Sequence, residues 1–315
     1  METENMNPYK KVSGVIMLET ISEYLAISMD KLELLEKITR QNSLLEKQAS
    51  DLKGALTKVE SQKEIIEGQN KILLQDLQKA ADFQISLLPD HLPELDNYKF
   101  SASFTPSFQL GGDYYDVFMI DERYVGILVA DASGHGVSSA MLSAMFKMTL
   151  GKYASYDLNP ASVFSKLNTD FCQVVQTGDF FSSFYGIIDL HENRFIYSNA
   201  AHPKPILYNY DEDKIIEFDS EGFLLGIMDE KITFERKEYI FSGRNRLFIY
   251  TDGLHEAINK QKIAYSEEKV KKELKKYARV DAAMFLNNVV KNLKKYTQSQ
   301  TFDDDLTMVV MDIIL

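Results

Sequence analysis

Four short acidic motifs in the last two thirds of this chain carry the residues whose types and spacing could do chemistry. They are Gly111–Asp116, Asp131–Gly136, Thr251–Gly253 and Asp303–Thr307. Three of them place an aspartate at or beside the end of an apolar, strand-like run. Carboxylate and carbonyl oxygens are the ligands that Mg²⁺ and Mn²⁺ prefer. The pattern therefore predicts a metal site assembled from distant parts of the sequence.

Each motif alone has a simpler interpretation as an ordinary turn. Asp131 follows an apolar run and precedes Gly134 and Gly136, and it could merely cap the helix expected after them. Asp252 and Gly253 repeat the order of strand, aspartate and glycine. Four such motifs at strand boundaries favour a metal or phosphate site over unrelated surface turns.

The elements that must position these motifs begin after a long helix. Between Met17 and Leu88 the chain has no proline and only two glycines, and it is rich in residues that favour helix. Heptad spacing places seven consecutive apolar residues at the d positions: Ile38, Leu45, Leu52, Val59, Ile66, Leu73 and Ala80. This periodicity predicts a parallel homodimeric coiled coil. A single helix folded back on its own domain remains the alternative, because the e and g positions are mostly Gln, Glu and Thr and specify orientation poorly.

Pro89 and Pro93 are expected to end this helix, because proline lacks an amide donor. We therefore predict an N-terminal segment (1–19), a coiled-coil dimerisation and regulatory helix (20–88) and a catalytic domain (89–315). Downstream, β-branched and aromatic runs predict strands at 98–104, 115–120, 124–130, 183–190, 194–198, 206–210, 232–240, 246–250 and 306–314. Helices are predicted at 137–153, 160–175, 267–277 and 281–296. The strands occur in hairpin-like groups, so the predicted fold class is α+β with antiparallel sheets.

The order and form of the motifs resemble the PPM superfamily of metal-dependent protein phosphatases, in its bacterial SpoIIE/RsbU-like branch. The resemblance spans roughly residues 87–315 and includes Leu87-Leu88-Pro89, Asn199–Pro203 and Gly222–Ile227 beside the acidic motifs. It implies an αββα sandwich of two antiparallel sheets that holds two Mn²⁺ or Mg²⁺ ions. It also implies a protein serine/threonine phosphatase in which metal-activated water attacks the phosphorus, with no protein nucleophile.

The resemblance also implies roles for individual residues. Asp131 would bridge both metals, Asp113 and the carbonyl of Ala132 would bind one of them, and Asp252 and Asp304 would bind the other. The expected supporting residues are Asp116, Asp305, Gly134 and Gly253. His135 stands four residues after its aspartate, instead of two as in eukaryotic members, which favours a loop residue over a general acid. Ala201 and Lys204 depart from the family pattern, and no arginine lies between Tyr98 and Asp113 to bind phosphate.

By the same resemblance, the expected substrate is a small phosphorylated STAS-domain protein, an anti-sigma-factor antagonist in a partner-switching pathway. We further hypothesise that the coiled coil controls activity through helices 137–153 and 160–175, which would brace the strand bearing Asp131. The alternative is a pseudophosphatase scaffold, although the chain keeps all four metal-binding aspartates. The Gly-Gly-Asp at 111–113 also resembles a diguanylate cyclase signature, but the rest of that pattern is missing.

The composition limits which partners and which cellular compartment are expected. The chain of 315 residues has a formal net charge of −12, which argues against a nucleic-acid partner or an anionic membrane surface. Its one cysteine, Cys172, excludes an internal disulfide and fits a cytoplasmic protein. No apolar run approaches the length of a membrane span, so no membrane insertion is expected.

Overall fold

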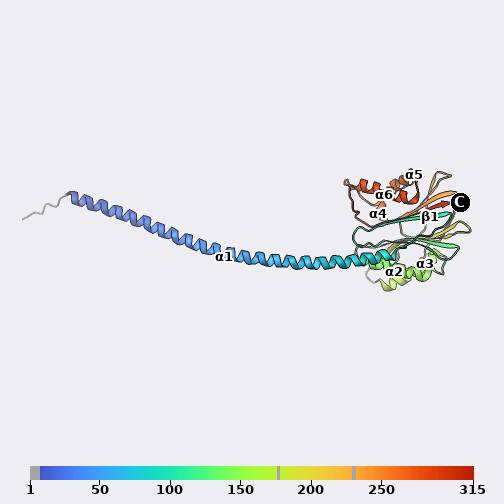
Figure 1. Ribbon diagram of the computed structural model, residues 1–315, viewed down its shortest axis with the longest axis horizontal. Coiled ribbons are helices and arrows are strands. Elements are labelled where there is room, and N and C mark those ends of the chain that lie inside the picture. Colours follow the sequence, from blue (N-terminus) through green and yellow to red (C-terminus); the bar gives the residue numbers. More distant parts are fainter. Residues whose placement is uncertain (1–7, 176–177, 229–231) are drawn as a thin grey trace, which may run out of the picture. The chain divides into compact units, whose positions relative to one another are not determined.

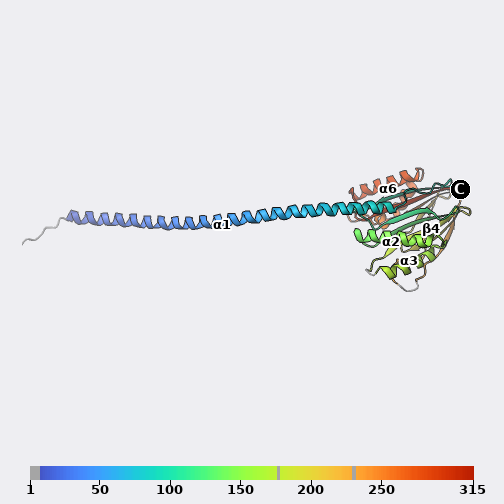
Figure 2. The same cartoon turned by 60° about the horizontal axis from the view of Figure 1, so that its bottom comes forward.

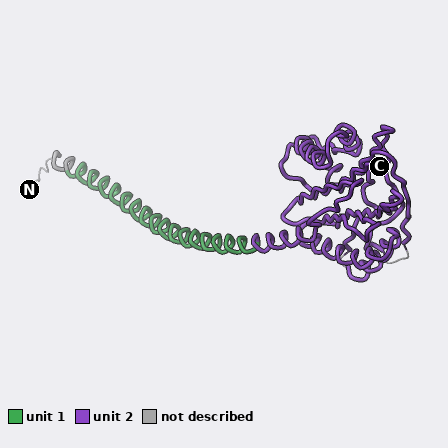
Figure 3. Tube along the Cα trace, turned by 45° about the vertical axis from the view of Figure 1, so that its right-hand side comes forward, with its two compact units in different colours: residues 1–73 green, residues 74–315 purple. Residues whose placement is uncertain are grey.

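The computed structural model describes residues 8–175, 178–228 and 232–315, with side chains from residue 14 onward. The chain forms two compact units, one up to Leu73 and one from Leu74 to Leu315 (Figure 3). No helix in the described part of the chain is both long enough and apolar enough to cross a membrane.

Helix α1 (Pro8–Leu87) is a single α-helix of 80 residues and ends two residues before Pro89, close to the predicted end. Its apolar d positions are open in the single chain: from Ile38 to Leu73 their exposed fractions lie between 44% and 63%. The a and d residues of the last predicted heptad are instead partly buried. Leu77 and Ala80 pack against Leu110 and Ala140 of the second unit, to which they belong. The apolar stripe of α1 is therefore exposed up to Leu73 and partly covered from Leu77 onward.

The second unit is a sandwich of two antiparallel five-stranded sheets, as the sequence predicted. Sheet A has the order β1 (Tyr98–Thr105), β10 (Leu306–Ile314), β9 (Arg244–Tyr250), β6 (Ile206–Asn209) and β7 (Lys214–Glu217). Sheet B has the order β2 (Tyr114–Met119), β3 (Tyr124–Ala132), β4 (Phe181–Asp189), β5 (Arg194–Ala200) and β8 (Lys237–Ile240). Figures 1 and 2 show the two sheets stacked face to face.

Helices cover both outer faces of the sandwich. Helices α2 (Val137–Ala154) and α3 (Pro160–Val174) pack on sheet B, while α5 (Glu267–Lys276) and α6 (Ala282–Thr297) pack on sheet A (Figure 1). Three apolar clusters fill the layers, one beneath each helix pair and one between the sheets. The predicted αββα sandwich is therefore confirmed.

Local boundaries differ from the prediction in three places. Strand β7 and the one-turn helix α4 (Asp252–His255) were not predicted, because four-residue elements carry little periodicity. The strand predicted over 232–240 was too long, since only Lys237–Ile240 pairs with β5. Before it, Phe234 turns inward and packs against Phe164 of α3, with ring centroids 5.6 Å apart.

Candidate metal centre at one end of the sandwich

Each sheet brings two of the four predicted aspartates to the same end of the sandwich. In sheet B, Asp113 precedes β2 and Asp131 lies at the end of β3, and these antiparallel strands pair with Tyr114 opposite Ala130. In sheet A, Asp252 follows β9 and Asp304 precedes β10, with Met308 opposite Tyr250. Antiparallel pairing explains the juxtaposition, because one strand ends where its neighbour begins.

A threonine connects the two pairs across the sandwich. The Thr251 hydroxyl donates a hydrogen bond to Asp113 Oδ2 (2.8 Å) and accepts one from the backbone N–H of Thr307 (3.0 Å). Thr251 and Thr307 are fully buried, and Asp113 is 2% exposed. Thr251 therefore orients the Asp113 carboxylate from the opposite sheet. The sequence analysis assigned no role to this threonine, and its position beside Asp252 was the only signal.

Asp305 holds the turn that precedes Asp113. Its Oδ1 accepts hydrogen bonds from the backbone N–H of Ser107 (2.7 Å) and from the Ser107 hydroxyl (3.0 Å), and its Oδ2 accepts one from Gly112 N–H (2.5 Å). A Cβ at Gly111 would lie 2.4 Å from Asp305 Oδ2, so this close approach requires glycine. The structure thus places Asp305 as a support for the turn.

A residue near the end of α1 forms hydrogen bonds with the same turn. Gln84 donates from its side-chain amide to the carbonyl of Gly111 (2.5 Å) and to the Ser143 hydroxyl (3.2 Å), and its side-chain oxygen accepts from Gly111 N–H (3.1 Å). Gln84 is 6% exposed. Both backbone groups of Gly111 are therefore satisfied by one side chain of α1. Sequence analysis missed this contact, for which a polar residue at the next a position of the heptad register was the only signal.

The glycines beside the aspartates have separate structural reasons. A Cβ at Gly112 would lie 2.6 Å from the carbonyl oxygen of Ala132, and one at Gly253 would lie 2.0 Å from that of Asp305. Gly134 and Gly136 have φ angles of 84° and 86°, the left-handed region that favours glycine. The turn after Asp131 and the start of α2 depend on these two residues.

The cluster carries uncompensated negative charge. Burial and the carboxylates of Asp131 and Asp305 raise the pKa of Asp113 well above its ordinary value. Burial and the carboxylates of Asp252, Asp304 and Asp305 raise the pKa of Asp131 to about 8. Burial also raises the pKa of Asp252 and of Asp304.

These carboxylates fit divalent cations. No lysine or arginine in the described part of the chain forms an ion pair with Asp113, Asp131, Asp252 or Asp304. Buried carboxylates without a counter-charge are costly, and oxygen donors suit Mg²⁺ and Mn²⁺. Within residues 8–175, 178–228 and 232–315, no three acidic, histidine or cysteine side chains lie close enough to enclose an ion as they stand.

A cavity of about 570 Å³ opens beside the carboxylates. Its lining includes Asp131, the backbone of Ala132, Asp252 and Asp304, together with Glu256 and Glu267. Lys204 is the one lysine or arginine among the described residues that line it, and its side chain is exposed. The cavity is large enough to admit a phosphorylated side chain at the metal ligands.

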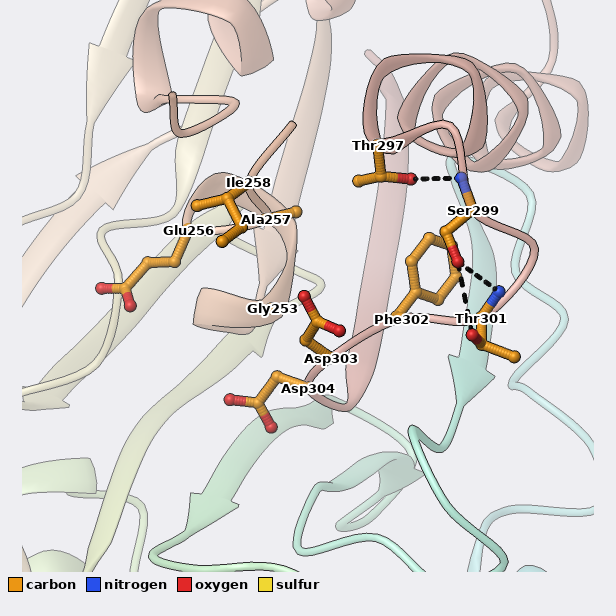
Figure 4. A pocket seen from close by; sticks show the side chains of 10 residues that line it. All are labelled: Gly253, Glu256, Ala257, Ile258, Thr297, Ser299, Thr301, Phe302, Asp303 and Asp304. Carbon is orange, nitrogen blue, oxygen red and sulfur yellow. Dashed lines mark hydrogen bonds between the residues drawn. The ribbon is translucent and has the colours of Figure 1, made fainter. Parts of the chain in front are cut away.

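A second hollow of about 260 Å³ adjoins this cavity and shares Glu256 and Asp304 with it. Figure 4 shows Asp303 and Asp304 between Ala257 and Ile258 on one side and a wall of Phe302, Thr297, Ser299 and Thr301 on the other. The wall is held by the Ser299 hydroxyl, which accepts a hydrogen bond from Thr301 N–H (3.2 Å). Of the four predicted aspartates, Asp304 therefore lines both hollows.

Asp116 lies apart from the carboxylates, whereas two histidines lie nearer to them: His135 acts on the pKa of Asp304, and His202 lines the cavity together with Asp131. Asp116 accepts a hydrogen bond from the Tyr114 hydroxyl (2.5 Å) and contacts none of the four aspartates. His135 is exposed and stacks on Phe108, with ring centroids 5.8 Å apart. His202 is buried, its Nδ1 lies 2.8 Å from the Ser182 hydroxyl, and burial lowers its pKa to about 3.

Comparison with known proteins identifies the family and the fold of the chain. Residues 121–314 match the profile of the family described as stage II sporulation protein E (SpoIIE). The chain belongs to the SpoIIE family. Its curated relatives include phosphoserine phosphatase RsbU of Bacillus subtilis (strain 168), 23% identical over 246 residues, or 78% of this chain and 72% of RsbU. The match covers less than half the length of two further curated relatives.

Solved structures show the same fold. The SiaA PP2C domain of Pseudomonas aeruginosa superposes with a TM-score of 0.68 at 18% identity, over 76% of this chain and 97% of that domain. The catalytic domain of serine/threonine protein phosphatase PstP, solved with two manganese ions, gives a TM-score of 0.52 at 13% identity, over 70% of this chain and 99% of that one. The sandwich of this SpoIIE-family chain is therefore a PP2C-type phosphatase fold.

Proposed function

We propose that this SpoIIE-family phosphatase removes phosphate from phosphoserine or phosphothreonine with two Mn²⁺ or Mg²⁺ ions held by Asp113, Asp131, Asp252, Asp304 and the Ala132 carbonyl. The observation that carries the proposal is the convergence of four carboxylates, two from each sheet, none of which forms an ion pair with a lysine or arginine of the described residues; three of them, Asp131, Asp252 and Asp304, line the 570 Å³ cavity. Paired divalent ions would deprotonate a shared water and neutralise charge on the phosphoryl oxygens.

The chain's own groups would prepare this chemistry. Thr251 donates to Asp113 Oδ2 and so fixes the orientation of this carboxylate. Asp305 and Gln84 hold the Gly111–Gly112 turn from two sides and limit movement of Asp113. A serine–histidine pair, Ser182 and His202, also lines the cavity, but burial lowers the pKa of His202 to about 3, which makes this histidine a weak base for activating a serine.

The test is hydrolysis of para-nitrophenyl phosphate by the full-length chain, measured against Mn²⁺ concentration. We expect metal-dependent turnover that disappears in Asp131→Asn and persists in Asp96→Asn, a matched control at an exposed position. Calorimetry should show Mn²⁺ binding in the wild type and weakened binding in Asp131→Asn. Mn²⁺ binding without turnover on this substrate or on a phosphoprotein would favour the scaffold interpretation instead.

For the physiological substrate, we propose a phosphorylated STAS-domain antagonist of an anti-sigma factor, in the cytoplasm. The support is kinship with phosphoserine phosphatase RsbU and the breadth of the cavity, which is open to a folded partner. A STAS-domain protein phosphorylated on serine should be dephosphorylated faster than an unrelated phosphopeptide. Equal rates on the two substrates would count against this assignment.

We also propose that α1 forms a parallel homodimeric coiled coil that regulates the phosphatase unit. The support is the row of exposed apolar d positions, which a second copy would bury. Leu52→Asp combined with Val59→Asp should give monomers in sedimentation analysis and alter turnover, whereas Ser61→Asp at an outward position should do neither. A wild-type monomer at micromolar concentration would contradict the proposal.

A further inference from the structure

A second cavity, of about 390 Å³, lies where sheet A meets the N-terminal end of α6. It is lined by Lys99 and Ser101 of β1, Tyr210, Arg244–Arg246 of β9, 278–283 before and within α6, and 312–314 of β10. Arg246 and Asp252 are six residues apart on β9 and the turn after it, which corresponds to about 20 Å of extended chain. The cavity is therefore separate from the metal centre.

Four cations and two carboxylates line this cavity, and the carboxylates already have partners. Asp312 accepts two hydrogen bonds from Arg246, at 2.5 Å and 2.7 Å. Asp281 caps α6 by accepting a hydrogen bond from Met284 N–H (2.8 Å). Arg246 is 1% exposed and also donates to the carbonyls of Tyr277 and Val280, so it belongs to the wall.

The other three cations have no carboxylate partner. Lys99, Arg244 and Arg279 are exposed, and none forms an ion pair with any residue of the described part of the chain. The Lys99 ammonium donates to the carbonyl of Leu95 (2.9 Å), and the Arg244 guanidinium lies over the Tyr210 ring, 5.3 Å from its centroid. Outside the lining, Asp211 binds only the backbone N–H of Arg244 (3.1 Å). The cavity thus carries net positive charge in a chain of formal charge −12.

We propose that this cavity binds a small phosphate-bearing ligand through Lys99, Arg244 and Arg279. Arginine and lysine form charge-assisted hydrogen bonds with phosphate oxygens. The volume exceeds that of inorganic phosphate, and the half-buried Tyr210 offers an aromatic surface beside the cations. A nucleoside monophosphate therefore fits better than free phosphate.

The experiment is calorimetric titration of the full-length chain with AMP, GMP and inorganic phosphate in parallel, in Mg²⁺ buffer at low and moderate salt. We expect saturable nucleotide binding that weakens with salt, and a loss of about tenfold in affinity for each cation removed in Arg244→Ser and Arg279→Ser. Arg40→Ser, on the exposed surface of α1, is the matched control and should bind like the wild type. Asp304→Asn should also bind normally, which separates this site from the metal centre.

Either of two results would overturn the inference. One is the absence of measurable binding of all three probes at millimolar concentration. The other is binding that Arg244→Ser and Arg279→Ser leave intact while Asp304→Asn abolishes it, which would assign the ligand to the metal centre. Near-ultraviolet circular dichroism of each variant checks that the fold is kept. Equal affinity for phosphate and nucleotides would support recognition of the phosphate group alone.

Discussion

Replacing Gln84 by methionine tests the contact through which the end of α1 reaches the turn before Asp113. Methionine keeps the length of the side chain but has no hydrogen-bonding amide. The N–H and the carbonyl of Gly111 would both lose their partner in a buried place. An unsatisfied buried polar group costs about 1–3 kcal/mol, so the free energy of unfolding should fall by about 2–5 kcal/mol. A loss of that size is a large fraction of the stability of an ordinary domain.

Urea unfolding followed by near-ultraviolet circular dichroism measures the loss of stability in the second unit, which contains Gln84 and Gly111. The chain has no tryptophan and 17 tyrosines, of which all but Tyr9 and Tyr24 follow residue 97. The tyrosine signal therefore reports on the sandwich, whereas the far-ultraviolet signal would be dominated by α1. Gln78→Met is the matched control, because Gln78 lies on the same helix and bonds only to Asp82 at the surface (2.9 Å).

The same variant should also need more metal. A loosened Gly111 turn releases Asp113, and loss of a group that orients a metal ligand typically weakens metal affinity by 10–100-fold. We expect the Mn²⁺ concentration for half-maximal turnover to rise about tenfold in Gln84→Met and to stay unchanged in Gln78→Met. A stability change below about 0.5 kcal/mol together with an unchanged Mn²⁺ requirement would refute the reasoning.

Three further predictions concern the metal centre and its cavity. Asp305→Asn removes one hydrogen-bond acceptor, so either Gly112 N–H or Ser107 loses its partner. The Mn²⁺ concentration for half-maximal turnover should rise about tenfold, and an unchanged value would exclude a role of Asp305 in positioning Asp113. Since the pKa of Asp131 is raised to about 8 from 3.8, the folded metal-free chain keeps a proton that the unfolded chain has lost. Its free energy of unfolding in EDTA should therefore fall between about pH 5 and 7.5, with Asp131 alone contributing up to about 1.4 kcal/mol per pH unit, and a flat profile would contradict the shift. Lys204→Ala should raise KM for a phosphoprotein about fivefold, because the substrate would lose an exposed ion pair with Lys204. Hydrolysis of para-nitrophenyl phosphate should stay unchanged. An equal rise in KM in a Lys260→Ala control would count against a specific contact with Lys204.

The α+β class with antiparallel sheets could be predicted from the chain because its signals are local, whereas the αββα sandwich was implied by the family resemblance. Strand-like runs end at Asp131 and before Asp252, and glycines follow both, so periodicity and turn chemistry indicated where each carboxylate would lie. The same local reasoning failed for β7 and α4, which are too short to show a period, and for residues 232–236, where burial of Phe234 displaced strand pairing.

The sequence by itself determined the acidic residues, the order of the elements and the apolar stripe of α1, because residue type and spacing encode them directly. Only the tertiary structure decided which groups hold those residues. Thr251 reaches Asp113 from the opposite sheet, and Gln84 reaches Gly111 from α1, across 138 and 27 residues of sequence. Contacts between residues so far apart in the sequence leave no periodic pattern in it. They arise when the packed layers bring buried donors and acceptors together, and burial makes each group's need for a partner strong.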